Sequence, residues 1–232
     1  MKIEILPDAD AVARRAAEQI AALARTASAE RGRFALALSG GHTPWAMLRE
    51  LSRQDLPWSA VHVFQVDERV APTGDRERNW THVCASLQPP AAFGPEQLHP
   101  MPVDAPDLDT GARDYERELA RFAGTPPVLD LVHLGLGPDG HTASLVPGDP
   151  ALEEAARDVA VTRPYQGRQR MTLTYPVLAR AREILWLVTG ADKADMLVRL
   201  RDADRDIPAG RVPGARALAL VDRDAAARLE RR

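Results

Sequence analysis

Residues 135–148 read GLGPDGHTASLVPG and combine a glycine-rich turn with side chains that can transfer protons. Three glycines match the G-x-G-x-x-G pattern of a dinucleotide-binding turn: Gly135, Gly137 and Gly140. The pattern indicates a dinucleotide site when the glycines begin a long helix and an acidic residue that binds the ribose follows about 20 residues later. Here Pro138 lies inside the turn, and Pro147-Gly148 interrupts the chain shortly after it. The stretch therefore predicts a tight polar loop and no dinucleotide cofactor.

His141 is the residue of this loop best suited to chemistry. An imidazole changes its protonation state near neutral pH and can serve as a general base. A single histidine is more often a cap or a solvent-facing side chain, but the neighbours of His141 favour a catalytic role. Either Asp139 or Glu68 can orient such an imidazole, and the sequence does not choose between them. His62 and His133 fall within apolar runs and are predicted to be core or pleat residues.

The stretch LSGGHTP (38–44) has the composition of an anion-binding turn. Gly40 and Gly41 let the backbone approach a ligand closely, and the amides of a helix that begins near Pro44 point toward it. Ser39 can bind or cap at the same place. An ordinary strand-to-helix turn explains the same residues equally well.

Charged residues flank three other apolar runs. Asp67, Glu68 and Arg69 come directly after VHVFQV, Arg170 begins RMTLTY, and Lys193 follows EILWLVT. An anionic substrate requires cations of this kind. Of the 30 basic residues only two are lysines, so an interior lysine suggests a required ammonium. An ordinary lysine at a helix N-terminus is the simpler interpretation of Lys193.

Predicted strands alternate with predicted helices along the chain. The strands span residues 2–6, 34–39, 61–66, 128–134, 158–162, 170–175, 183–190 and 217–221. The helices run from Asp8 or Asp10 to about residue 29, from near Pro44, over 79–87 and 107–123, from about 192, and at the C-terminus. Residues 88–106 contain six prolines and are predicted to cross the surface within a single domain, residues 1–232. The alternation predicts an α/β fold with a mainly parallel sheet and helices on both faces, with ligands at the carboxyl ends of the strands.

Composition excludes several classes of function. The 232 residues carry a formal net charge of −3, which gives no bulk attraction to nucleic acid or an anionic membrane. The single cysteine, Cys84, suits a reducing compartment, and no apolar stretch approaches the roughly 20 residues needed to span a bilayer. We therefore expect a cytoplasmic protein. No sequence pattern of a serine hydrolase elbow or a zinc site is present.

Taken together, the motifs resemble the 6-phosphogluconolactonase family. The stretches that carry the resemblance are LSGGHTP, VDERVAP with Asn79 after it, LGLGPDGHTASLVPG, QRMTLT and VTGADKADML. The wider superfamily includes glucosamine-6-phosphate deaminase and has a modified Rossmann-like fold. The resemblance implies hydrolysis of 6-phospho-D-glucono-1,5-lactone in the pentose phosphate pathway, without a metal or another cofactor.

The resemblance also implies roles for particular residues. His141 is expected to activate water, with Asp139 or Glu68 beside it. The substrate and its phosphate are expected to contact Ser39, Gly40, Gly41, Asp67, Arg69, Asn79, Gly137, Arg170 and Lys193. The chain departs from the family pattern at His42, Arg78 and Gln169, among other positions, which leaves the roles of these flanking residues open.

Two other functions fit a sugar-phosphate site. An amino-sugar-6-phosphate deaminase or isomerase would bind the same phosphate and transfer protons on an open-chain sugar. A non-catalytic sugar-phosphate sensor would bind without turnover, but such domains are usually fused to a DNA-binding element, and no basic helix-turn-helix segment is present. The sequence does not give the oligomeric state and is compatible with a monomer.

Overall fold

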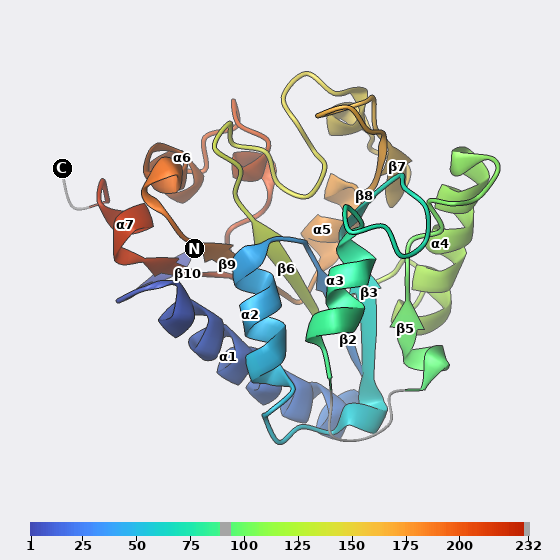
Figure 1. The fold of residues 1–232 in the computed structure, drawn as a ribbon, viewed down its shortest axis with the longest axis horizontal. Helices are drawn as coiled ribbons and strands as arrows, with labels where there is room; N and C mark the ends of the chain where they lie inside the picture. Colours follow the sequence, from blue (N-terminus) through green and yellow to red (C-terminus); the bar gives the residue numbers. More distant parts are fainter. Residues whose placement is uncertain (89–93, 230–232) are drawn as a thin grey trace.

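The computed structural model describes residues 1–88 and 94–229, and a seven-stranded sheet lies at its centre (Figure 1). The strand order is β1-β10-β9-β6-β2-β3-β5, and each neighbouring pair is parallel. These strands are β1 (Lys2–Leu6), β2 (Phe34–Leu38), β3 (Val61–Gln65), β5 (Leu98–His99), β6 (Leu131–Gly135), β9 (Glu183–Val188) and β10 (Ala217–Asp222). A smaller antiparallel sheet has the order β4-β8-β7. Its strands are β4 (Asp67–Arg69), β7 (Val159–Val161) and β8 (Arg170–Leu173).

The α-helices of the described residues lie on both faces of the large sheet (Figure 1). They are α1 (Ala9–Arg31), α2 (His42–Leu51), α3 (Asn79–Ser86), α4 (Leu108–Ala123), α5 (Tyr175–Arg180), α6 (Ala194–Arg201) and α7 (Arg223–Ala226). One apolar cluster joins one face of the sheet to α1, α2 and α3, and the other joins the opposite face to α4, α5, α6, α7 and the small sheet. The predicted α/β fold, with a mainly parallel sheet covered on both faces, is confirmed.

Local sequence explains the elements nearest the centre. All five residues of β2 are buried, as expected for a parallel strand with helices on both faces. Helix α1 begins where the Asp8 carboxylate accepts a hydrogen bond from the backbone N–H of Ala11, which settles the open choice between Asp8 and Asp10. It ends at Gly32, whose φ of 71° favours glycine.

Some of the predicted elements differ from the structure. The strands predicted at 158–162 and 170–175 do not join the large sheet: β7 and β8 pair antiparallel with each other, and β8 pairs with β4. The segment 88–106 is not only a crossing, because β5 within it pairs with β3 at the sheet edge. Residues 89–93 of that segment lie outside the described residues. The C-terminal helix α7 is only four residues long.

The large sheet positions the candidate site. The stretches that follow β2, β3, β6 and β9 contain most of the residues singled out in the sequence, whereas Arg170 stands in β8 of the small sheet. Parallel strands bring their carboxyl ends to one edge. Within the described ranges, no helix is long and apolar enough to cross a membrane.

Candidate active site

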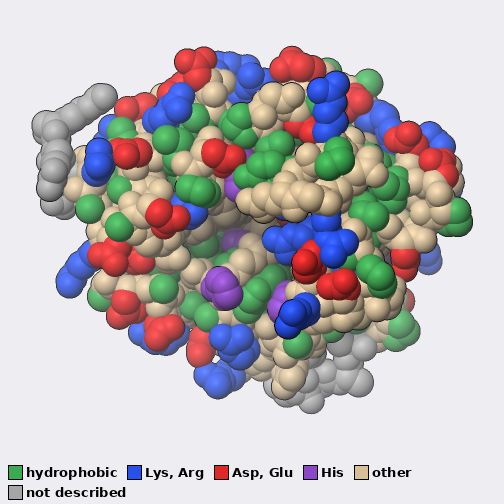
Figure 2. Space-filling model, turned by 45° about the horizontal axis from the view of Figure 1, so that its top comes forward, with side chains coloured by type: hydrophobic (Ala, Val, Ile, Leu, Met, Phe, Trp, Pro, Cys, Tyr) green, Lys and Arg blue, Asp and Glu red, His purple; other side chains and the backbone are tan. Residues whose placement is uncertain are grey.

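A pocket of about 210 Å³ lies beyond the carboxyl ends of these strands. It is lined by these predicted site residues: Ser39, Gly40, Gly41, Asp67, Arg69, Asn79, Gly137, His141, Arg170 and Lys193. Figure 2 looks onto this face and shows a hollow with histidine and basic side chains near its border. Pockets for drug-sized ligands are usually about 300–1,000 Å³, so this volume suits a small metabolite. Asp139 and Glu68, both within the described chain, do not line the pocket themselves.

The loop after β6 holds His141 through its backbone and one carboxylate. The backbone N–H of Gly137 donates to the His141 carbonyl at 2.8 Å. Asp139 Oδ1 lies 2.5 Å from His141 Nδ1 and accepts from the His141 backbone N–H at 3.1 Å. A Cβ at position 137 would collide with the His141 ring and the Asp139 carboxylate. Glycine is therefore required where this pair approaches the backbone.

The contact with Asp139 fixes the position of the imidazole proton. An ionised carboxylate can only accept, so Nδ1 of neutral His141 carries the hydrogen and Nε2 keeps its lone pair. Burial acts to raise the pKa of the Asp139 carboxyl, but the hydrogen bonds and charge of His141 outweigh it and hold that pKa below its ordinary value. The side chains of His141 and Asp139 are 22% and 38% exposed, so water can reach the pair.

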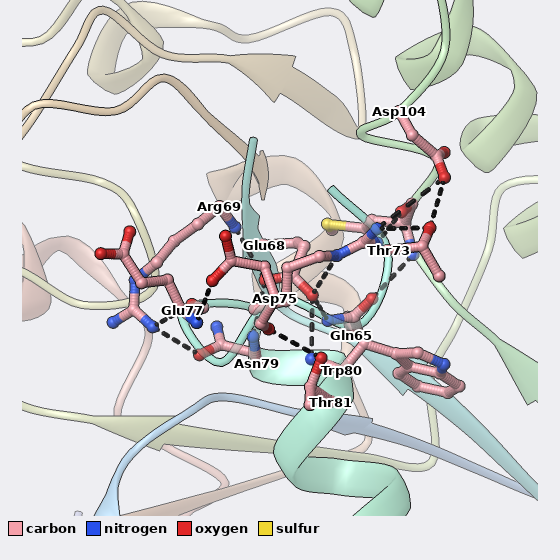
Figure 3. A network of polar contacts seen from close by, with 12 residues as sticks. Gln65, Glu68, Arg69, Thr73, Asp75, Glu77, Asn79, Trp80, Thr81 and Asp104 are labelled. Atoms are coloured by element: carbon pink, nitrogen blue, oxygen red, sulfur yellow. Dashed lines mark hydrogen bonds and ion pairs between the residues drawn. The ribbon is translucent and has the colours of Figure 1, made fainter. Parts of the chain in front are cut away.

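Glu68 has a different environment. Its fully buried carboxylate accepts hydrogen bonds at 2.8–2.9 Å from the Gln65 side chain and from the backbone N–H groups of Arg69, Asn79 and Trp80. Figure 3 shows Glu68 beside Gln65, Asn79 and Trp80. The guanidinium of Arg78 lies 3.4 Å from the Glu68 carboxylate. Two of these donors are the first N–H groups of α3, so Glu68 joins β4 to that helix. Of the two carboxylates expected to orient the imidazole, Asp139 contacts the ring and Glu68 caps α3.

Asn79 connects two walls of the pocket. Its Nδ2 donates to the Asp67 carbonyl at 3.1 Å, and its Oδ1 accepts from Arg69 Nη1 at 3.2 Å. A Cβ on Gly40 would collide with the Asn79 amide. The glycine turn after β2 therefore lies directly against the start of α3.

Cations predominate in the lining of the pocket. The lining contains three basic side chains and one acidic one: Arg69, Arg170 and Lys193 against Asp67. Burial raises the pKa of Asp67, although the Ser144 hydroxyl donates to its carboxylate at 2.6 Å. Burial also lowers the pKa of the Arg170 guanidinium, with Asp67 acting in the opposite direction. This lining suits an anionic ligand.

The turn after β2 rests on a buried histidine. The Ser39 backbone N–H donates to Nδ1 of His133 at 3.2 Å, and burial lowers the pKa of His133 to about 3. His133 is fully buried in β6, so the prediction that it is a core residue is confirmed. Ser39 lines the pocket, and its buried hydroxyl has no hydrogen-bond partner among the described residues.

Sequence reasoning missed Tyr165, which lies in the turn between β7 and β8. Its hydroxyl donates to Asp139 Oδ2 at 3.2 Å, and its ring meets the His141 ring edge-on at a centroid distance of 5.6 Å. The Arg170 guanidinium lies 4.9 Å from the centroid of the same ring. The only sequence signal near Tyr165 is the PYQG turn, and a turn pattern does not reveal what its side chains contact.

Two arginines flank this turn. Arg163 is exposed, and Arg168 forms an ion pair with Glu77. Neither lines this pocket, although Arg168 borders a second cavity, which Arg69 and Arg170 also line.

Comparison with known proteins shows the family to which the chain belongs. Residues 7–220 match the family described as glucosamine-6-phosphate isomerases/6-phosphogluconolactonase. The chain belongs to this family. It is 39% identical to a 6-phosphogluconolactonase of Mycobacterium tuberculosis over 98% of both chains, and 42% identical to one of Synechocystis over 74% of this chain and 72% of that one. The solved 6-phosphogluconolactonase of Trypanosoma cruzi superposes with a TM-score of 0.88 at 28% identity, covering 99% of this chain and 97% of the other.

Proposed function

We propose that the protein hydrolyses 6-phospho-D-glucono-1,5-lactone to 6-phospho-D-gluconate in the pentose phosphate pathway, with His141 as the general base. One observation carries the assignment of the base: the His141–Asp139 pair borders a pocket lined by three cations. Full-length similarity to the 6-phosphogluconolactonase of Mycobacterium tuberculosis supports the choice of substrate.

The proposed chemistry needs no covalent intermediate, because a lactone is an ester closed into a ring. Nε2 of His141 takes a proton from water while the water oxygen attacks the lactone carbonyl carbon. Positioned base catalysis of this kind typically contributes about 10²–10⁴-fold. The carbonyl oxygen becomes negatively charged and is stabilised by a cation of the lining. The tetrahedral intermediate then collapses, the ring oxygen leaves, and the imidazolium returns a proton to it.

The cations have a second task in this proposal. Arg69, Arg170 and Lys193 bind the phosphate, whose binding energy helps to position the reacting carbonyl. The turn Ser39–Gly40–Gly41 and the N-terminus of α2 line the sugar-phosphate. Asn79 holds Arg69 in place through its amide oxygen.

The decisive experiment measures acid release at neutral pH from freshly generated 6-phosphogluconolactone, against a control without enzyme because the lactone opens spontaneously. We expect the protein to exceed the control by orders of magnitude. A rate equal to the control contradicts the proposal. Ammonia release from glucosamine 6-phosphate in a parallel assay would indicate a deaminase instead, and binding of 6-phosphogluconate without turnover would indicate a sensor.

The proposal places the reaction in the cytoplasm, where the protein acts on a free metabolite and binds neither nucleic acid nor membrane. The net charge of −3 and the single cysteine support this choice.

A further inference from the structure

We propose that Tyr165 is a positioning residue, whose hydroxyl holds the Asp139 carboxylate in the geometry that proton transfer by His141 requires. The inference rests on the proposed lactonase function and adds a residue that the family motifs do not contain. Tyr165 stands in the turn between β7 and β8, whereas Asp139 and His141 stand in the loop after β6. The contact therefore joins the small sheet to the catalytic loop.

The two oxygens of Asp139 have separate donors. Oδ1 faces the Nδ1 and backbone N–H of His141 at 2.5 and 3.1 Å, and Oδ2 accepts from the Tyr165 hydroxyl at 3.2 Å. With a donor on each side, the carboxylate plane cannot rotate without losing a hydrogen bond. The edge-on contact of the tyrosine ring with the imidazole restricts the same pair from another direction.

The opposite side of Tyr165 faces the anion-binding cations. The Arg170 guanidinium lies over its ring, and Arg170 also donates to the Gln166 side chain at 3.2 Å. The ion pair between Arg168 and Glu77 fastens the other side of the turn to the loop before α3. Tyr165 thus contacts both halves of the proposed machinery, the base with its carboxylate and a phosphate-binding arginine.

The charges around Tyr165 keep its hydroxyl a donor. Burial raises the pKa of Tyr165, the negative charge and hydrogen bond of Asp139 raise it further, and Arg170 acts in the opposite direction. A protonated hydroxyl takes up part of the negative charge of Asp139, which weakens the hold of that carboxylate on an imidazolium. Loss of the hydroxyl should therefore stabilise the protonated form of His141. The positive charges of Arg69, Arg170 and Lys193, which line the same pocket, act against that form.

The test compares Tyr165→Phe, which keeps the ring, with Tyr165→Ala, which removes it. Thr110→Val is a matched control, because it deletes a hydroxyl that donates to Asp107 at the start of α4. We expect Tyr165→Phe to lower kcat about threefold to tenfold, the loss typical of one hydrogen bond, with KM within about twofold of wild type. We also expect the acid limb of its kcat/KM profile to move to higher pH. Tyr165→Ala should in addition raise KM, because Arg170 loses the ring beneath it.

The outcomes separate this inference from the function on which it rests. If wild type does not exceed spontaneous lactone opening, the lactonase function fails, and the positioning role of Tyr165 in that reaction is overturned with it. If wild type is active and Tyr165→Phe matches it in kcat and in pH profile, the positioning role is overturned. A fall in kcat with an unmoved pH profile, or one shared by Thr110→Val, indicates general destabilisation and also overturns it.

Discussion

The pocket has two walls that are built differently. The anion-binding wall, formed by β4 and the start of α3, rests on Glu68, which is fully buried and has hydrogen-bond donors on both oxygens. The proton-transfer wall, formed by the loop after β6 and the Tyr165 turn, rests on Asp139, whose side chain is 38% exposed. In the described chain, the side-chain donors to Asp139 are His141 and Tyr165.

This difference fits the role proposed for each wall. Cations that hold a phosphate must stay in place, and several mutually supporting hydrogen bonds fix them. A base that activates water must be reached by water and must exchange its proton, so it cannot be enclosed in the same way. Loss of a buried contact should therefore act mainly on stability, and loss of a contact in the exposed wall should act mainly on turnover.

The largest effect is expected from Glu68→Ala. The change removes the buried carboxylate that the Arg78 guanidinium faces, and it leaves the first N–H groups of α3 without their acceptor. Removing one member of a buried pair typically costs about 3–5 kcal/mol. Urea unfolding should show a loss of this size, whereas Glu50→Ala, which breaks a surface pair with Arg53, should cost less than about 1 kcal/mol. Equal losses in the two variants would contradict the structural role of Glu68.

A substitution in the proton-transfer wall should act mainly on turnover. Asp139→Asn replaces an acceptor of the Nδ1 proton with an amide that can present a donor, so the imidazole can adopt the wrong tautomer. We expect kcat to fall about 10²-fold, with unfolding free energy changed by less than about 1 kcal/mol. Asp10→Asn, an equivalent change in the exposed first turn of α1, should leave kcat intact. A variant with wild-type kcat would remove Asp139 from the mechanism.

The buried His133 should make the stability of the fold depend on pH. Its pKa is about 3 in the folded protein because of burial, whereas an unfolded histidine titrates near 6.5. Below pH about 6.5 the unfolded chain therefore binds a proton that the folded chain does not, and stability falls as pH falls. The expected loss from this residue is about 2 kcal/mol at pH 5 and none at pH 8.

The comparison that isolates His133 is the difference in unfolding free energy between pH 8 and pH 5, measured for wild type and for His133→Gln. The other histidines whose pKa is lowered by desolvation, His62 and His99, are present in both proteins, so their contributions cancel. Parallel pH profiles for the two proteins would show that His133 does not cause the acid sensitivity.

The smallest effect is expected from Lys193→Ala. Its ammonium lies 2.8 Å from the Asp192 carboxylate and is partly exposed. Solvent therefore weakens its electrostatic attraction for a bound phosphate. We expect KM to rise about tenfold with kcat within about threefold. Lys2→Ala, at the other lysine of the chain, should leave both constants unchanged. A fall in kcat without a rise in KM would mean that Lys193 acts in the chemical step.

The sequence predicted the large sheet well because its strands are continuous apolar runs such as FALAL and EILWLV. It did not predict the small sheet, because the pairing of Asp67 with Thr172 joins residues far apart in the chain. The pocket-lining residues were predicted because several strands end together. The separate environments of Asp139 and Glu68 were not, since two carboxylates near strand ends look alike until burial is known. Tyr165 shows the same limit, because its contacts depend on how a turn folds back over the site.

The most direct test of the division between the two walls is His141→Ala, measured for both turnover of 6-phosphogluconolactone and affinity for 6-phosphogluconate. Removing the base should lower kcat by about 10²–10⁴-fold. Product affinity should stay within about threefold, because the cations and their supports remain in place. Wild-type turnover in this variant, or a loss confined to affinity, would contradict the assignment of His141 as the base.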